Sequence, residues 1–166
     1  MALGGSRRRV GMAVIRIVTM IAAPIDRCFD LARDIDFHTR SLAATGERAV
    51  AGRITGLIGL GESVTWEARH LGVRQRFTAE VTVFERPVYF RDVMTAGAFK
   101  SFAHDHRFED RGGETMMTDE VVFRSPLGPL GWLVDYLFMT GYLRRLLEGR
   151  CQAIKHEAES IARETA

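Results

Sequence analysis

Two histidines stand one residue apart in the stretch FAHDHRF, which runs from Phe102 to Phe108. Imidazole side chains bind transition metals, and they also take up and release protons near neutral pH. His104 and His106 could therefore be metal ligands, an acid/base pair, or the polar part of an otherwise apolar pocket wall. The choice between these chemistries depends on how the surrounding elements position the two rings.

Hydrophobic alternation predicts that this stretch is a β-strand with the two histidines on its buried face. Residues two apart on a strand point the same way, so His104 and His106 share a face with Phe102 and Phe108. The other face is mostly charged and is expected to be in solvent; it consists of Ala103, Asp105, Arg107 and Glu109.

The following segment, ETMMTDEVVFR, predicts the partner strand, and the intervening residues 110–113 (DRGG) predict a tight hairpin turn. If these four residues form the whole loop, the strand register can be counted outward from it. The predicted cross-strand pairs on the buried face are His106–Met117, His104–Asp119 and Phe102–Val121. We therefore expect a buried contact between His104 and Asp119.

A contact between His104 and Asp119 has two interpretations. The carboxylate could fix the tautomer of the imidazole and raise its pKa, which would make the pair a catalytic acid/base unit. It could also simply satisfy a polar histidine in the cavity wall. We favour the second interpretation, because buried polar groups ordinarily find partners without taking part in a reaction.

A metal site would need three or more converging ligands. His104, His106 and Asp119 could supply them, with His70 as a fourth from another strand. However, the sequence has no closed set of cysteines and histidines at zinc-binding spacing. We therefore expect no metal and no cofactor.

Other motifs argue against common enzyme classes. The stretch GLIGLG, residues 56–61, has the spacing GxxGxG and precedes a predicted strand, whereas a dinucleotide-binding loop must precede a helix. No GxSxG motif is present for a hydrolase nucleophile.

The elements that must position the histidines follow from hydrophobic periodicity. Residues 14–21 alternate as a strand, and IDRCFDLARDI after Pro24 has helical spacing. A second short helix, FHTRSLAA, precedes about six strands, and a long helix follows Pro126. Short turns between strands indicate an antiparallel sheet, whose apolar face the long helix can cover. The expected fold is α+β.

Composition sets limits on partners and compartment. The chain has 166 residues, which is one domain by length, and a formal charge of +2, which gives no support for nucleic-acid binding. No apolar run approaches the roughly 18 residues of a membrane span. A basic patch, Arg144, Arg145 and Arg150, is interpreted as a solvated helix face, with peripheral membrane contact as a minority interpretation.

The two cysteines, Cys28 and Cys151, are far apart and lie among helix-forming residues, so both are predicted to be small core side chains. Their use favours a reducing, cytoplasmic compartment. Residues 1–12 are predicted to be a disordered leader, and Met12 is a second candidate start.

The order of elements and their sequences resemble the SRPBCC superfamily of helix-grip domains, which includes START-like domains and polyketide cyclases/dehydrases. The resemblance covers about residues 13–160, and we assign a single domain to residues 13–163. It rests on the segments IAAPIDRCFDLARDIDFH, GLIGLGESVTWEARH, RFTAEVTVFERPVYFRD, FKSFAHDHRFED, GGETMMTDEVVF and SPLGPLGWLVDYLF.

This resemblance implies a curved antiparallel sheet wrapped around a long C-terminal helix, two short helices after the first strand, and a deep, largely apolar cavity. In such folds the second short helix often borders the cavity mouth, which would place His38 and Ser41 there; a solvated helix face would explain them equally well.

Three functions remain open from the sequence, and the first is the one we favour. The chain would bind a hydrophobic small molecule such as a lipid, quinone or polyketide. The expected ligand-binding residues are Trp66, His70, Phe77, Phe102, His104, His106, Asp119 and Val121. The alternative is a cyclase or dehydratase that uses His104 and Asp119 for proton transfer, and a weaker one is a non-catalytic accessory protein. Both monomer and homodimer fit the sequence.

Overall fold

The computed structural model describes residues 12–43, 46–70, 72–126, 128 and 138–164. The predicted leader, except Met12, and part of the region before the last helix lie outside the described residues. The elements are β1 (Ala13–Ile21), α1 (Ile25–Ala32), α2 (Ile35–Ser41), β2 (Arg48–Gly52), β3 (Ser63–His70), β4 (Val73–Glu85), β5 (Tyr89–Ala96), β6 (Ser101–Asp110), β7 (Thr115–Arg124) and α4 (Thr140–Glu164).

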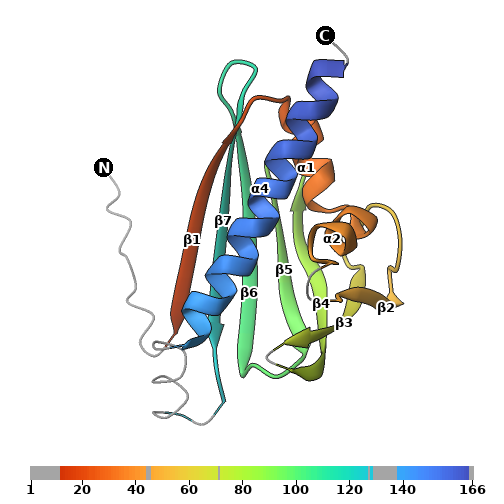
Figure 1. The fold of residues 1–166 in the computed structure, drawn as a ribbon, viewed down its shortest axis with the longest axis vertical. Helices are drawn as coiled ribbons and strands as arrows, with labels where there is room; N and C mark the ends of the chain where they lie inside the picture. Colours follow the sequence, from red (N-terminus) through yellow and green to blue (C-terminus); the bar gives the residue numbers. More distant parts are fainter. Residues whose placement is uncertain (1–11, 44–45, 71, 127, 129–137, 165–166) are drawn as a thin grey trace.

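The described strands form one antiparallel sheet in the order β1-β7-β6-β5-β4-β3-β2. Helix α4 lies across one face of this sheet, and α1 and α2 lie beside it (Figure 1). This arrangement confirms the expected α+β helix-grip fold. None of the described helices combines the length and the apolar character needed to cross a bilayer.

Local sequence explains the first elements. In β1, Ile15, Thr19 and Ile21 are buried while the residues between them are more exposed, as the alternation predicted. Pro24 then stands at the N-cap of α1, where its fixed φ and missing N–H suit a helix start. Asp34 caps α2, because its carboxylate accepts hydrogen bonds from the backbone N–H groups that follow it.

The β6–β7 hairpin differs from the predicted register. The strands extend to the pair Asp110–Thr115, and the backbone N–H of Arg111 donates to the carbonyl of Glu114, so the loop begins one residue later than expected. The observed pairs are His106–Asp119, His104–Val121 and Phe102–Phe123. Because every partner moves by two residues, the predicted buried face is preserved although the predicted pairs are wrong.

The outer face of β6 departs from the prediction at one residue. Arg107 and Glu109 are exposed, as expected for the solvent side of the sheet, but Asp105 is only 2 % exposed. The hydroxyl of Tyr89 donates a hydrogen bond to Asp105, and Arg91 and Arg107 approach the same carboxylate. Neighbouring side chains on the outer face therefore cover this carboxylate.

The core confirms the prediction for the cysteines. Both Cys28 and Cys151 are buried and free, and both lie in an apolar cluster that also contains Phe29, Phe108 and Ile154. Burial raises the pKa of each thiol above its ordinary value.

Candidate ligand-binding site

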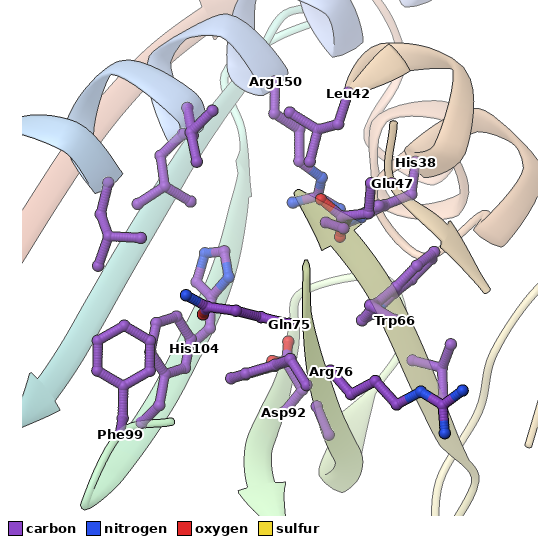
Figure 2. A pocket seen from close by; sticks show the side chains of 18 of the residues that line it. His38, Leu42, Glu47, Trp66, Gln75, Arg76, Asp92, Phe99, His104 and Arg150 are labelled. Atoms are coloured by element: carbon purple, nitrogen blue, oxygen red, sulfur yellow. Dashed lines mark hydrogen bonds and ion pairs between the residues drawn. The ribbon is translucent and has the colours of Figure 1, made fainter. Parts of the chain in front are cut away.

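A cavity of about 430 Å³ lies between the inner face of the sheet and helix α4. The strand side of its wall includes apolar residues of β3 and β4, and the helix side includes Leu143, Leu146 and Leu147. A few polar side chains reach the cavity from both sides (Figure 2). A mostly apolar cavity with few, well-placed polar groups is the usual form of a site for a small apolar ligand.

Most of the expected wall residues lie where the sequence placed them. Trp66, Phe77, Phe102, His104 and His106 all line the cavity. The rings of Phe77 and Phe102 meet edge to face, with centroids 5.1 Å apart. Alternation on β3, β4 and β6 sufficed to identify these residues, because it shows which side chains point to the inner face of the sheet, where the cavity lies.

Two expected ligand contacts are corrected by the structure. Val121 does not line the cavity; it is fully buried in a cluster with Ile15 and Phe123, against which Leu147 of α4 packs. The reason is that β7 lies between β1 and β6, where the helix closes directly onto the sheet. Asp119 is also outside the cavity lining, behind the two histidines.

His70 ends β3, and its side chain lies outside the part of the structure that is described. Its expected role at the rim of the cavity therefore stays a prediction.

The expected contact between His104 and Asp119 is present, although it runs diagonally and not between directly paired residues. The Nε2 atom of His104 lies 2.8 Å from Oδ1 of Asp119. The Nδ1 atom of His106 lies 2.9 Å from the same oxygen, and its Nε2 atom lies 2.9 Å from Oδ2 of Asp92. The result is a continuous chain of polar groups, Asp92–His106–Asp119–His104.

The other carboxylate oxygen of Asp119 accepts from the thiol of Cys151, at 3.4 Å. Asp119 thus has partners on β6 and on α4. A buried carboxylate is costly unless it is paired, and these partners compensate for that cost. Because they come from β6 and from α4, Asp119 also links the sheet to the helix.

Electrostatics shift the pKa values of the two histidines in opposite directions. Burial lowers the pKa of His104, and the neighbouring His106 lowers it further, against the opposing effect of Asp119. Burial also disfavours the charged form of His106, but its hydrogen bonds with Asp119 and Asp92 outweigh this and raise its pKa above 6.5. Asp119 is held well below its ordinary pKa, because the two histidines overcome the cost of burial. The arrangement therefore favours a charged His106 and a neutral His104.

A grouping that could hold a metal ion is present, with both expected histidines but with Asp92 as the carboxylate in place of Asp119. Asp92, His104 and His106 each offer one ligand atom, and these atoms lie within 4.8 Å of one another. Two histidines and a carboxylate could hold a divalent cation. A proton on His106 satisfies the same carboxylates without an ion, so the expectation of no metal stays a prediction.

Asp92 itself was missed, although its strand carries a usable signal. It faces His104 across the β5–β6 ladder and lines the cavity. Extending the alternation from the buried Phe90 by two residues would have placed it on the inner face.

A second polar group lies at the α2 side of the cavity. His38 stacks on Trp66 with ring centroids 4.1 Å apart, and its Nε2 atom lies 3.0 Å from Oε1 of Glu47. His38 and Glu47 both line the cavity, which favours the cavity-border interpretation of His38. Ser41 is not among the lining residues; its hydroxyl donates to the carbonyl of His38.

Arg150 corrects the prediction of a solvated basic patch on the last helix. Its side chain is buried, reaches the cavity from α4, and donates to the carbonyl of Ala32 at the end of α1. Arg145 is exposed, as expected. Helical spacing carries a signal that separates these residues, because Arg150 lies three residues after Leu147 and four before Ile154, on the apolar side of the helix, whereas Arg145 does not.

Known proteins place this architecture in context. A family model described as "Polyketide cyclase / dehydrase and lipid transport" matches residues 12–159. No curated protein shows significant sequence similarity to the chain.

Solved structures share the fold at low sequence identity. The Zhui aromatase/cyclase from Streptomyces sp. R1128 has a TM-score of 0.69 and 17% identity, over 89% of this chain and 94% of that chain. A protein of Thermus thermophilus has a TM-score of 0.67 and 20% identity, over 86% of this chain and 97% of that chain. A START superfamily protein of Mycobacterium smegmatis has a TM-score of 0.65 and 12% identity, over 89% and 98%. These likenesses establish the fold.

Proposed function

The chain belongs to the family of polyketide cyclases, dehydrases and lipid-transport proteins, and on that premise we propose that it binds a largely apolar small molecule between the sheet and helix α4. The observation that carries this proposal is the cavity of about 430 Å³, with its apolar walls and few polar groups. Trp66, Phe77 and Phe102 provide aromatic surface for a hydrocarbon or ring system.

The polar groups at the cavity would orient the ligand, and burial of apolar surface would provide most of the affinity. Each buried methylene contributes about 0.8 kcal/mol, so a ligand of modest size can bind well without many hydrogen bonds. His104, with Asp119 behind it, and Asp92 would bind a polar substituent on the ligand.

The test is to load the protein with a fluorescent apolar probe, 1-anilinonaphthalene-8-sulfonate, and to measure its displacement by small apolar compounds. Ala79 is buried in the cavity wall, so Ala79→Trp should fill the space and abolish binding. Thr82→Trp, on the exposed side of the same strand, is the matched control and should bind as the parent does. Equal binding by both variants would contradict a ligand site in this cavity.

A second candidate function is ring closure with loss of water, and the Asp92–His106–Asp119–His104 chain is the observation that favours it. A carboxylate only accepts hydrogen bonds, so neutral His104 carries its proton on Nε2 toward Asp119, and Nδ1 is the basic nitrogen. That nitrogen could remove a proton from a carbon between two carbonyl groups of a poly-β-ketone. The carbanion would attack a third carbonyl carbon, and the resulting alkoxide would take the same proton back from His104. The new hydroxyl would then leave as water together with the hydrogen that remains on the attacking carbon, which forms a carbon–carbon double bond.

His104→Gln separates the two functions. With a synthetic poly-β-ketone as probe and product formation followed by mass spectrometry, the variant should lose at least about a hundredfold in turnover, as expected for a general base. Its affinity for the probe should change little. If neither the parent protein nor His104→Gln converts the poly-β-ketone but both bind it, ring closure is excluded and ligand binding is the function.

A further inference from the structure

Arg150 is a buried charge on the helix side of the cavity. Its side chain is 6 % exposed and lines the cavity from α4, opposite the strands that carry His104 and Asp92 (Figure 2). Arginine is rarely buried to this degree unless an anionic or hydrogen-bonding partner compensates for the lost hydration.

The hydrogen bonds of Arg150 are incomplete within the described part of the chain. One terminal nitrogen donates to the backbone carbonyl of Ala32, and the buried Nε has no hydrogen-bond partner. Among the described residues, the ion pairs found for the carboxylates around the cavity are with histidines and not with this guanidinium.

The nearby carboxylates already have other partners. Asp92 is hydrogen-bonded to His106, Asp119 is hydrogen-bonded to His104 and ion-paired with His106, and Glu47 is hydrogen-bonded to His38. Each of these contacts directs a carboxylate oxygen toward an imidazole. Within the described ranges, the guanidinium of Arg150 thus borders the cavity and has the neutral carbonyl of Ala32 as its hydrogen-bond acceptor.

We propose that Arg150 binds an anionic oxygen of the ligand, a carboxylate or an enolate, and so selects acidic amphiphiles among apolar compounds. This inference rests on the proposed ligand-binding function and adds the chemical class of the ligand. A guanidinium donates several N–H groups in a planar fork, which matches a carboxylate or a 1,3-diketone enolate. The bond forms away from bulk water, where charge-assisted hydrogen bonds are strongest.

The geometry also orients the ligand. Its anionic group would lie at α4, near the α2 side of the cavity, while its apolar body contacts Trp66, Phe77 and Phe102 on the sheet. Leu143 and Leu147 of α4 cover the same body from the helix side. An acid of matching size is therefore preferred over an alcohol or a hydrocarbon.

A purely structural role for Arg150 must be distinguished from this one. Its hydrogen bond to Ala32 satisfies a carbonyl at the C-terminus of α1, where a positive charge also interacts favourably with the helix dipole. Such a role would affect stability and would not discriminate between ligands. The readout must therefore be ligand preference.

The experiment compares 2-naphthoate with 2-naphthalenemethanol by isothermal titration calorimetry at neutral pH, with benzoylacetone as the enolate arm. The unmodified protein should prefer naphthoate over the alcohol by about tenfold to a hundredfold, the effect expected of charge-assisted hydrogen bonds. Arg150→Gln should remove this preference, and Arg150→Lys should retain part of it. Arg145→Gln, the same change at an exposed position of α4, should leave it intact.

A second readout is independent of variant folding. The ¹⁵Nε resonance of Arg150 in the unmodified protein should shift on addition of naphthoate and not on addition of the alcohol. Equal affinity for acid and alcohol, or a preference that survives Arg150→Gln, would overturn the inference while the proposed function stands. Binding of no probe at all would overturn both. Tighter binding of benzoylacetone than naphthoate would identify the enolate as the preferred anion.

Discussion

The inner face of the sheet is filled solidly on one side and hollow on the other. Under α1 and the C-terminal half of α4, Phe29 meets Phe84, Phe90 and Phe108 edge to face, each with centroids 5.4 Å apart. Toward β3 and β4, Trp66, Phe77 and Phe102 border the cavity instead.

Strand β6 passes through both regions. Phe108 is in the solid core, Phe102 faces the cavity, and the two histidines lie between them. The ring of His106 stacks on Phe90 of the core at 4.0 Å, whereas His104 follows it toward the hollow side. The same face of β6 thus contributes residues both to the solid core and to the cavity wall. The position of α4 over the strand determines which residues belong to each.

The largest effect should come from the solid region. Phe29→Ala removes a fully buried ring from close packing and should lower the free energy of unfolding by about 3–5 kcal/mol. Phe102→Ala removes the same ring from the wall of an existing cavity, where the ring is less closely packed. It should lower the free energy of unfolding by on the order of 1 kcal/mol. Chemical denaturation of both variants measures the difference. Equal losses would mean that the two regions are packed alike.

At the border between the regions, Asp119→Asn should lower the free energy of unfolding by about 1–3 kcal/mol, because it leaves buried histidines without their charged acceptor. Glu120→Gln, on the outer side of the same strand, is the control and should stay within about 0.5 kcal/mol. A loss no greater than that of the control would show that the network adds no stability.

On the hollow side, Phe102→Ala should matter for binding more than for stability. Loss of its ring from the wall should weaken an apolar ligand about tenfold, equivalent to roughly 1.4 kcal/mol. Probe displacement measures this in a variant whose unfolding curve is nearly that of the parent. Unchanged affinity would place the bound ligand away from β6.

The smallest effect is the pH dependence of stability. His106 has a raised pKa when folded, so its contribution is complete below the ordinary value of 6.5 and is lost as the pH rises through its folded pKa. His104 has a lowered pKa, so stability is lost as the pH falls below 6.5 toward its folded pKa. Unfolding measured across about pH 5 to 8 should therefore show a maximum.

The variant His106→Gln should remove the loss of stability on the alkaline side of that maximum. His156→Gln, at an exposed position of α4, should leave the profile unchanged. NMR titration of the folded protein measures the pKa of each imidazole. A lower pKa for His106 than for His104 would contradict the assigned charges.

Several features of the site could be predicted because they depend on alternation alone. The buried face of β6, the wall residues Trp66 and Phe77, and the contact between His104 and Asp119 all followed from strand phase. The contact withstood a wrong register because a shift of two residues preserves the face, and a histidine side chain can reach a diagonal neighbour.

Other features could not be obtained this way. Whether Val121 or Phe102 borders the cavity depends on where α4 approaches the sheet, and the alternation is the same at both. Helical spacing places Arg150 on the apolar side of α4, but the packing of α1 against that helix decided that it is buried beside the cavity. These outcomes depend on contacts between elements that are distant in the chain.

The sequence by itself determined the order of elements, the inward face of each identified strand and the family, because these depend on local periodicity and on motifs that neighbouring residues carry. The tertiary structure alone decided which inward residues enclose a cavity and which form solid core. It also brought Asp92 and Arg150 to that cavity, because the helix covers the sheet closely at one end and leaves space at the other.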